Sequence, residues 1–193
     1  PLVMKIVAEG ITHKSDVGGV RLNLRDAQEV ELAWDEIAAA IMRLPQKVDS
    51  WSVTLEPMIS GGRELVMGIH SEPLFGPLVM VGMGGIYVEV LKDVAFRLTP
   101  VTDTDIDHML KSLRGYPILS GVRGEPSIAF DFVYDMLARL SQLARDFPQI
   151  KELDINPLLA NEDGVIALDA RIRIEASELD APAPNPRLAI RPY

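Results

Sequence analysis

A lysine on an apolar segment and a glycine-containing loop follow one another near the start of the chain. Lys5 lies within the apolar run PLVMKIV, and His13, Gly18 and Gly19 follow in the string HKSDVGGV. A glycine-rich loop lets backbone N–H groups approach phosphate oxygens, and a nearby lysine adds a point charge. The pattern is compatible with a phosphate site, although a single lysine in a strand is more often an edge residue or one whose ammonium group reaches solvent.

Oxygen ligands gather in the last quarter of the sequence. Asp154 and Asn156 alternate on a predicted strand and therefore share one face, while Asp169 lies on the partner strand of the same hairpin. Hard oxygen ligands that converge from two strands suit Mg²⁺ bound to nucleotide phosphates. The alternative is a turn at Asn156-Pro157, with Asp169 paired to Arg171 or Lys151. Apolar neighbours favour the cation, because a buried carboxylate without a partner is costly.

Two further carboxylates lie on either side of a predicted turn. Glu56 and Glu64 are eight residues apart across Gly61-Gly62. Such carboxylates can accept hydrogen bonds from an adenine amine or from ribose hydroxyls. A solvated carboxylate at the end of a strand is the alternative for each of them.

Several strands and three helices are predicted to position these residues. Asp26 with Glu29 begins the first helix, and Asp103 and Ser127 are the predicted caps of the other two. The glycines at 61–62 predict a hairpin between strands 50–59 and 63–70, and the segment 161–164 predicts another. The remaining predicted strands cover residues 1–7, 21–24, 78–81, 88–98, 151–159 and 165–174. This order indicates an α+β layer architecture.

Composition narrows the function classes. The 193 residues carry a net charge of −9, which argues against a nucleic-acid-binding surface because phosphate backbones require clustered cations. The chain has no cysteine, which excludes disulfides and thiolate metal sites and makes a cytoplasmic location the default expectation. No apolar run reaches the ~20 residues that span a bilayer, and no signal peptide opens the chain. Since the first residue is Pro1, we expect a piece of a longer polypeptide.

Five strings in order resemble a known family. PLVMKI, HKSDVGGV, LEPMISGGRELVMGI, FGPLVMVGMGG and ELDINPLLANEDGVIALDARI are similar to the ATP-grasp domain of NDP-forming (ADP-forming) acyl-CoA synthetases, relatives of the succinyl-CoA synthetase β subunit. The resemblance implies an ATP-grasp fold with mixed or antiparallel sheets flanked by helices. It assigns residues 1–55 to a partial lid-side subdomain, 56–174 to the C-terminal subdomain and 175–193 to a linker. The family has a helical segment before the strand that bears Lys5, so the lid portion is expected to be incomplete.

The same resemblance implies roles for individual residues, with ATP or ADP and Mg²⁺ as the bound groups. It makes Lys5 a contact of the α- and β-phosphates, and it implies a phosphorylated His13 that carries the phosphoryl group. Asn156 and Asp169 match the Mg²⁺ ligands, and Asp154 matches an acidic residue close to the transfer site. The remaining implied nucleotide contacts are Gly18, Gly19, Glu56, Met58 and Glu64. His70 and His108 have no such setting and are expected to be structural or solvated.

The end of the chain carries a second, shorter resemblance. PRLAIRPY is similar to the junction of multidomain protein lysine acetyltransferases, where an ATP-grasp domain passes into an acetyltransferase module. The first hypothesis is therefore a phosphoryl-transferring part of an acid–CoA ligase, with CoA-binding and CoA-ligase domains in the same chain or in a partner subunit. The alternative is a non-catalytic, nucleotide-binding regulatory module of such an acetyltransferase. Under the first hypothesis we expect the fragment alone to be inactive. Under both hypotheses we expect no nucleic-acid and no membrane partner.

Overall fold

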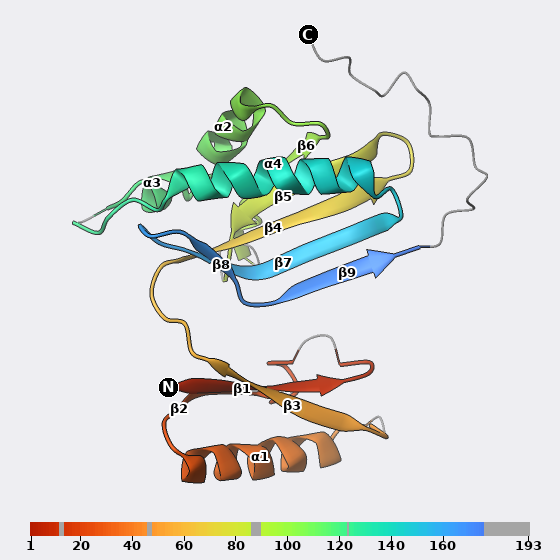
Figure 1. Cartoon of the computed structure of the whole chain (residues 1–193), viewed down its shortest axis with the longest axis vertical. Coiled ribbons are helices and arrows are strands. Elements are labelled where there is room, and N and C mark those ends of the chain that lie inside the picture. The colour runs from red at the N-terminus through yellow and green to blue at the C-terminus, as the bar shows by residue number, and fades with distance from the viewer. Residues whose placement is uncertain (12–13, 46–47, 86–89, 123, 176–193) are drawn as a thin grey trace. The chain divides into compact units, whose positions relative to one another are not determined.

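The computed structural model divides the chain into two compact units (Figure 1). It describes residues 1–193 except 12–13, 46–47, 86–89, 123 and 176–193. The first unit is Pro1–Ser60 and the second is Gly61–Tyr193. The division thus falls a few residues beyond the predicted boundary at residue 55, and the roles predicted for the parts 1–55, 56–174 and 175–193 stay predictions.

The first unit is a three-stranded antiparallel sheet with a helix on one face. Strand β1 is central, with β2 and β3 on its two sides. Met4 and Ile6 of β1 pack against the helix, and Lys5 between them therefore lies on the other face of the sheet. We call this other face the outer face of the first sheet. The elements are β1 (Leu2–Ala8), β2 (Val20–Leu24), α1 (Ala27–Met42) and β3 (Trp51–Pro57).

Helix α1 begins as its sequence predicts, and its apolar stripe packs on the sheet except at Trp34. The carboxylate of Asp26 accepts a hydrogen bond from the backbone N–H of Glu29 across 2.8 Å, which satisfies one of the unpaired N–H groups at the helix start. Ile37 and Ile41, four residues apart, are buried against the sheet. Trp34, predicted on the same stripe, is 43% exposed and instead contacts Trp51 of β3, with ring centroids 4.7 Å apart.

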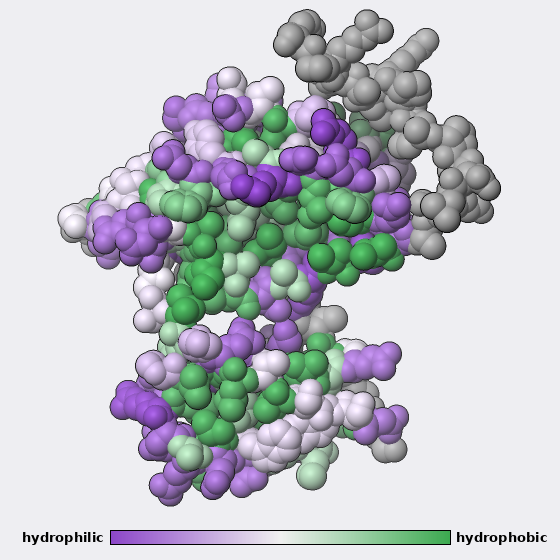
Figure 2. All heavy atoms as spheres, in the orientation of Figure 1, coloured by the Kyte–Doolittle hydropathy of each residue, from purple (hydrophilic) through white to green (hydrophobic). Residues whose placement is uncertain are grey.

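The second unit is a larger sheet with its helices on one face (Figure 1). The strand order is β6-β5-β4-β7-β8, and β9 also pairs with β7, always antiparallel. Figure 2 shows hydrophilic residues over α4 and apolar residues next to them over the strands. The elements are β4 (Arg63–Glu72), β5 (Gly76–Met83), β6 (Val94–Leu98), α2 (Asp103–Ser112), α3 (Tyr116–Leu119), α4 (Phe130–Asp146), β7 (Ile150–Ala160), β8 (Val165–Ala167) and β9 (Ala170–Ile174).

The core of the second unit lies between this sheet and helices α2 and α4. Alternate residues of β4, namely Leu65, Met67 and Ile69, pack with buried residues of the helices. Because side chains alternate along a strand, Glu64 and His70 lie on the opposite face, which we call the outer face of the second sheet. Both of these residues are exposed. The outer face of the second sheet therefore carries polar side chains that are open to solvent.

The predicted hairpin between strands 50–59 and 63–70 is wrong. Strand β3 pairs with β1 over the whole register from Leu2↔Pro57 to Ala8↔Trp51, whereas β4 pairs with β5 and β7. Gly61 and Gly62, with φ of 84° and 90°, connect the two sheets and do not form a tight turn between paired strands. Local turn chemistry misled the interpretation, because strands far apart in the sequence, β1 for β3 and β7 for β4, are the partners in the fold.

Three other local predictions need correction. Helix α2 is capped by Thr102 and not by Asp103, because the Thr102 hydroxyl accepts from the Asp105 N–H at 3.2 Å while the Asp105 carboxylate accepts from the Thr102 N–H at 2.9 Å. Helix α4 begins at Phe130, and Ser127 lies before it with its hydroxyl donating to the Ile128 carbonyl oxygen. The strand predicted over 88–98 begins only at Val94: residues 90–93 are not strand, and 88–89 lie outside the described residues.

The hairpin predicted near the end of the described chain is confirmed. Asn161 Oδ1 accepts hydrogen bonds from the N–H groups of Asp163 and Gly164, each at 3.0 Å, and β7 and β8 pair on either side. Residues 176–193, which include the predicted linker and PRLAIRPY, lie outside the described residues. Among the helices that the structure describes, none combines the length and apolar character needed to cross a bilayer.

Candidate functional site

Lys5 is held by a carboxylate on the outer face of the first sheet. Its ammonium group donates to Oε2 of Glu56 across 2.8 Å, and its side chain is only 17% exposed. Lys5 and Thr54 are opposite each other in the β1–β3 register, so Thr54 shares this face. Because β1 is the central strand, the interpretation of Lys5 as an edge residue does not apply.

Glu56 carries a negative charge between hydrogen-bond donors. The hydrogen bond from Lys5 is the main cause that lowers the pKa of Glu56, against an opposing effect of burial. The Thr54 hydroxyl donates to its Oε1 at 3.0 Å, and the charges of Lys5 and Lys14 lower the pKa further. Thr54, Glu56 and Lys5 thus form a chain of hydrogen bonds that fixes the position of the ammonium group.

Gly18 and Gly19 do not offer their N–H groups as the sequence predicted. Gly18 N–H donates to the Ser15 carbonyl oxygen at 3.0 Å, and Gly19 N–H donates to that of Lys14 at 2.7 Å. A Cβ atom at Gly19 would lie 2.3 Å from Cγ2 of Ile6, so this glycine lets the loop approach β1. In this structure the loop is closed on itself, and a role of these glycines in nucleotide binding stays a prediction. His13 lies outside the described residues.

Asn156 and Asp169 are brought together in the second unit. Asn156 is on β7, Asp169 lies between β8 and β9, and the Asn156 N–H donates to the Asp169 carbonyl oxygen at 3.1 Å. Asp154, two residues earlier on β7, is opposite Arg171 of β9. The backbone thus brings Asn156 and Asp169 next to each other, although Asp169 lies between two strands and not on one, and their role as oxygen ligands stays a prediction.

The apolar surroundings that favoured a buried cation are not found. Leu153 and Ile155 are buried in the core on the helix side, whereas Asn156 is exposed and Asp169 is half-buried. Arg171 lies 3.9 Å from the Asp169 carboxylate, so the ion pair left open by the sequence is present at long range. Among the described residues no group of three His, Cys, Asp or Glu could hold a metal ion. An ion at Asn156 and Asp169 would need further ligands, such as phosphate oxygens or water.

Glu64, the second residue of β4, lies on the outer face of the second sheet, next to two glycines that follow β5. The Gly84 N–H donates to the Glu64 carbonyl oxygen at 2.7 Å. The position of a Cβ atom on Gly85 lies 2.9 Å from Glu64 Oε2. Sequence reasoning noticed the glycines and the glutamate separately. The signal that could have joined them is the antiparallel pairing of β4 with β5, which puts Leu65 opposite Met83.

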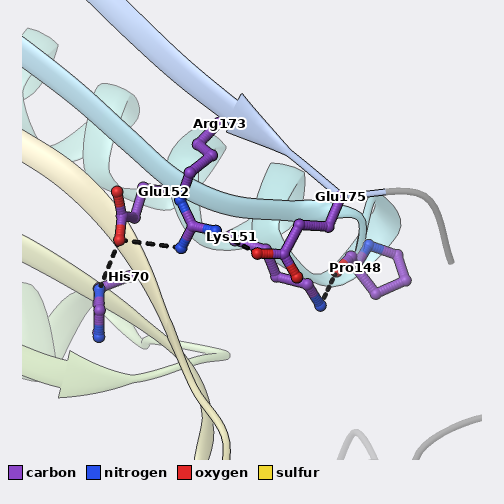
Figure 3. A network of polar contacts seen from close by, with 6 residues as sticks. All are labelled: His70, Pro148, Lys151, Glu152, Arg173 and Glu175. Atoms are coloured by element: carbon purple, nitrogen blue, oxygen red, sulfur yellow. Dashed lines mark hydrogen bonds and ion pairs between the residues drawn. The ribbon is translucent and has the colours of Figure 1, made fainter.

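A polar network crosses strands β4, β7 and β9 on the same unit (Figure 3). Glu152 lies 3.0 Å from Arg173 and 3.9 Å from Nδ1 of His70, and Arg173 also pairs with Glu175. The hydrogen bond with Arg173 lowers the pKa of Glu152 and raises that of Arg173. The partners are about half exposed, so the network adds little to stability. His70 is a surface residue, as predicted.

An apolar groove of about 470 Å³ lies on the helix-covered side of the first unit. Met4, Val53 and Leu55 of the sheet form one side, and Val30 and Trp34 of α1 form the other. Lys5 and Thr54 lie on the opposite face of the sheet. Glu31 and Asp35 of α1 complete the lining of the groove. We place the candidate residues of this unit on its outer face, where Lys5, Thr54 and Glu56 are joined by hydrogen bonds, and not in this groove.

Fold and charged residues together define an ATP-grasp domain, and comparison with known proteins agrees. The sequence profile of the ATP-grasp domain matches residues 1–174, so the chain belongs to this family and the predicted α+β ATP-grasp fold is confirmed. The β subunit of acetate–CoA ligase [ADP-forming] I from Pyrococcus furiosus is 44% identical over 172 residues, which cover 89% of this chain and 74% of that subunit. The predicted kinship with ADP-forming acyl-CoA synthetases is thereby confirmed.

Two further relatives extend this comparison. The 4-hydroxybutyrate–CoA ligase [ADP-forming] of Nitrosopumilus maritimus is 47% identical over 174 residues, which cover 89% of this chain but only 25% of that protein. The solved acetyl-coenzyme A synthetase 1 of Ca. Korarchaeum cryptofilum superposes with a TM-score of 0.77 at 38% identity, over 91% of this chain and 76% of that chain. That structure holds coenzyme A and Mg-AMPPCP, with its phosphohistidine segment pointing towards the nucleotide binding site.

Proposed function

We propose that this chain binds Mg-ATP and transfers a phosphoryl group within an ADP-forming acyl-CoA synthetase. The observation that carries the proposal is the convergence of Asn156 and Asp169 through the 3.1 Å backbone hydrogen bond, in a chain of the ATP-grasp family. The nucleotide analogue and magnesium in the Korarchaeum relative support the same ligand. The well-fixed ammonium group of Lys5 is the second support.

The oxygen donors present suit Mg²⁺. Asn156 offers an amide oxygen and Asp169 a carboxylate, and Mg²⁺ is commonly held by one or two such protein oxygens together with phosphates and water. When bound, the ion would neutralise charge on the phosphates. Asp154 of β7, which is opposite Arg171 of β9, is the proposed acidic residue close to the site of phosphoryl transfer.

On the first unit, Lys5 would contact the α- and β-phosphates. Its partner Glu56, with Met58, would face the base, because a carboxylate accepts from an amine and a thioether packs on an aromatic ring. Gly18 and Gly19 would shape the loop that ends at β2. Glu64 of the second unit would accept from ribose hydroxyls or the adenine amine.

His13 is the proposed acceptor of the phosphoryl group. A neutral imidazole nitrogen attacks the γ-phosphorus of ATP, the bond between that phosphorus and the bridging oxygen breaks, and ADP leaves. The phosphohistidine would then pass its phosphoryl group on, in the overall conversion of acid, CoA and ATP to acyl-CoA, ADP and phosphate; in the reverse direction it would return the phosphoryl group to ADP. CoA-binding and CoA-ligase domains, in the same chain or in a partner subunit, are the proposed partners. The isolated chain is expected to bind nucleotide weakly and not to turn over.

Labelling tests this proposal. The intact protein is incubated with γ-³²P-ATP and Mg²⁺, and the same is done with His13→Ala; His108→Ala serves as the matched histidine control. Acid-labile label in the wild type and in the control, lost in His13→Ala, supports the proposal. Label in none of the three supports the alternative, a regulatory module before an acetyltransferase. That alternative rests on PRLAIRPY alone, outside the described residues, and stays a prediction.

A further inference from the structure

The glycine run after β5 lies directly on Glu64. Strands β4 and β5 are antiparallel, and Leu65 is opposite Met83. One residue further along, Gly84 is therefore opposite Glu64. The hydrogen bond from Gly84 N–H to the Glu64 carbonyl oxygen, 2.7 Å long, continues this pairing beyond the end of β5. Neither glycine has a role in the function proposed above.

The two glycines meet different parts of Glu64. A Cβ atom at Gly84 would lie 2.8 Å from Glu64 Cβ and 2.9 Å from its carbonyl carbon, both of which are fixed by the strand. A Cβ atom at Gly85 would meet Oε2 of the carboxylate at 2.9 Å, and its next neighbour is the carboxyl carbon at 3.9 Å. Gly84 therefore allows the backbones to approach, whereas Gly85 leaves room for the carboxylate itself.

Backbone conformation alone does not account for Gly85. Its φ of +58° lies in the left-handed region that favours glycine. Gly124, with φ of +85°, also has a positive φ in the region that favours glycine, but a Cβ atom there would meet nothing within 4 Å. The space at Gly85 is occupied by a side-chain oxygen, and only the terminal atoms of a flexible side chain would have to move if a methyl group were added.

We infer that Gly85 is a positioning residue that sets the direction of the Glu64 carboxylate on the outer face of the second sheet. The carboxylate rests against the glycine and is an acceptor for hydroxyl or amino donors. This inference rests on the proposed function, in which Glu64 binds the nucleoside part of ATP. Because a carboxylate repels phosphate, Glu64 is expected to contact the nucleoside part of the nucleotide. A change at Gly85 should therefore alter the affinities for ATP and ADP to a similar extent.

Substitution of Gly85 tests this inference in the full-length protein. Calorimetry with Mg-ATP and Mg-ADP compares the wild type with Gly85→Ala, Glu64→Ala and the double variant. Gly124→Ala is the control, because it also places an alanine at a positive φ. We expect Gly85→Ala to weaken both nucleotides by about tenfold, the equivalent of one lost hydrogen bond. Gly124→Ala should change neither affinity more than about twofold, and both alanine variants should lose similar thermal stability. In the Glu64→Ala background, Gly85→Ala should have no further effect.

Two outcomes of the binding measurements overturn the inference. One is an equal loss from Gly85→Ala with and without the Glu64 carboxylate, and the other is an equal loss from Gly124→Ala. A second measurement does not depend on nucleotide: the ¹³C carboxyl resonance of Glu64, assigned with Glu64→Ala, should shift in Gly85→Ala and stay in place in Gly124→Ala. If wild type binds no nucleotide, the proposed function fails, and an unmoved carboxyl resonance would separately refute the positioning role.

Discussion

The backbone N–H of Asn156 donates to the carbonyl oxygen of Asp169 across 3.1 Å, where β7 meets the junction of β8 and β9. A second hydrogen bond, from Leu168 N–H to the Pro157 carbonyl oxygen at 3.0 Å, lies beside it. Two backbone contacts on adjacent residues fix the distance between the two strands at this point. The side chains of Asn156 and Asp169 thus start from neighbouring, fixed positions, which a shared cation requires.

Removal of the Asp169 carboxylate tests the magnesium site. We expect Asp169→Asn to lower the affinity for ATP in the presence of Mg²⁺ by at least about tenfold, because a charged ligand is replaced by a neutral one. The affinity measured in EDTA should change much less. Calorimetry in both buffers gives the comparison, and Asp163→Asn, in the exposed turn before β8, removes the same charge elsewhere. An equal loss with and without Mg²⁺ would contradict the assignment.

Lys5→Met tests the phosphate contact on the first unit. The variant loses the cation that faces the outer side of the sheet, and we expect weaker binding of ATP and ADP by about tenfold or more. Adenosine, which has no phosphate, should lose much less affinity than ATP. Lys5→Met also leaves the Glu56 carboxylate without its Lys5 partner, which could destabilise the fold. The double variant Lys5→Met/Glu56→Gln removes that charge and shows whether a folding defect causes the loss of affinity. Lys111→Met, on an exposed lysine of α2, is the charge-matched control. Equal losses for adenosine and ATP would argue against a phosphate contact.

Stability should depend on pH through Glu56. Hydrogen bonding to Lys5 lowers the pKa of Glu56 below its ordinary value of 4.5 in the folded state. A lowered folded-state pKa gives stability that is present above the unfolded pKa and is lost as the pH falls through the folded pKa. We therefore expect the difference in unfolding free energy between wild type and Glu56→Gln to shrink from neutral pH to about pH 3. Urea unfolding of both proteins at each pH measures this difference. A difference that stays constant over this range would contradict the ion pair.

Local signals in the sequence predicted the elements well. Asp26 with Glu29 predicted the start of α1, and the Asn161–Gly164 turn predicted the β7–β8 hairpin that brings Asn156 near Asp169. These features depend on residues a few positions apart, so their chemistry is contained in a short window. The proximity of Asn156 and Asp169 was accessible to sequence reasoning for the same reason.

Long-range partners were not accessible in this way. Lys5 and Glu56 are 51 residues apart, and their contact requires the pairing of β1 with β3, which the glycines at 61–62 had wrongly assigned to a β3–β4 hairpin. Burial at Asp169 also depends on which side of the sheet the helices cover, and this is decided by the packing of α2 and α4. Patterns of alternation predict two faces of a strand without saying which of them is covered.

Asp93 is a buried carboxylate that no sequence pattern indicated, and it gives the last prediction. It is 6% exposed and accepts from the N–H groups of Arg114 and Gly115, each at 2.8 Å, while its own carbonyl oxygen accepts from Met83 N–H at 3.0 Å. Asp93→Ala leaves both N–H groups without this acceptor, so we expect a loss of about 2–4 kcal/mol in unfolding free energy. Asp93→Asn keeps one acceptor and should lose less. Asp163→Ala on the surface should change stability by less than about 0.5 kcal/mol. Urea unfolding measures these differences. If Asp93→Ala is as stable as the Asp163→Ala control, the two N–H groups find other acceptors, and Asp93 does not hold the start of α3 against the end of β5.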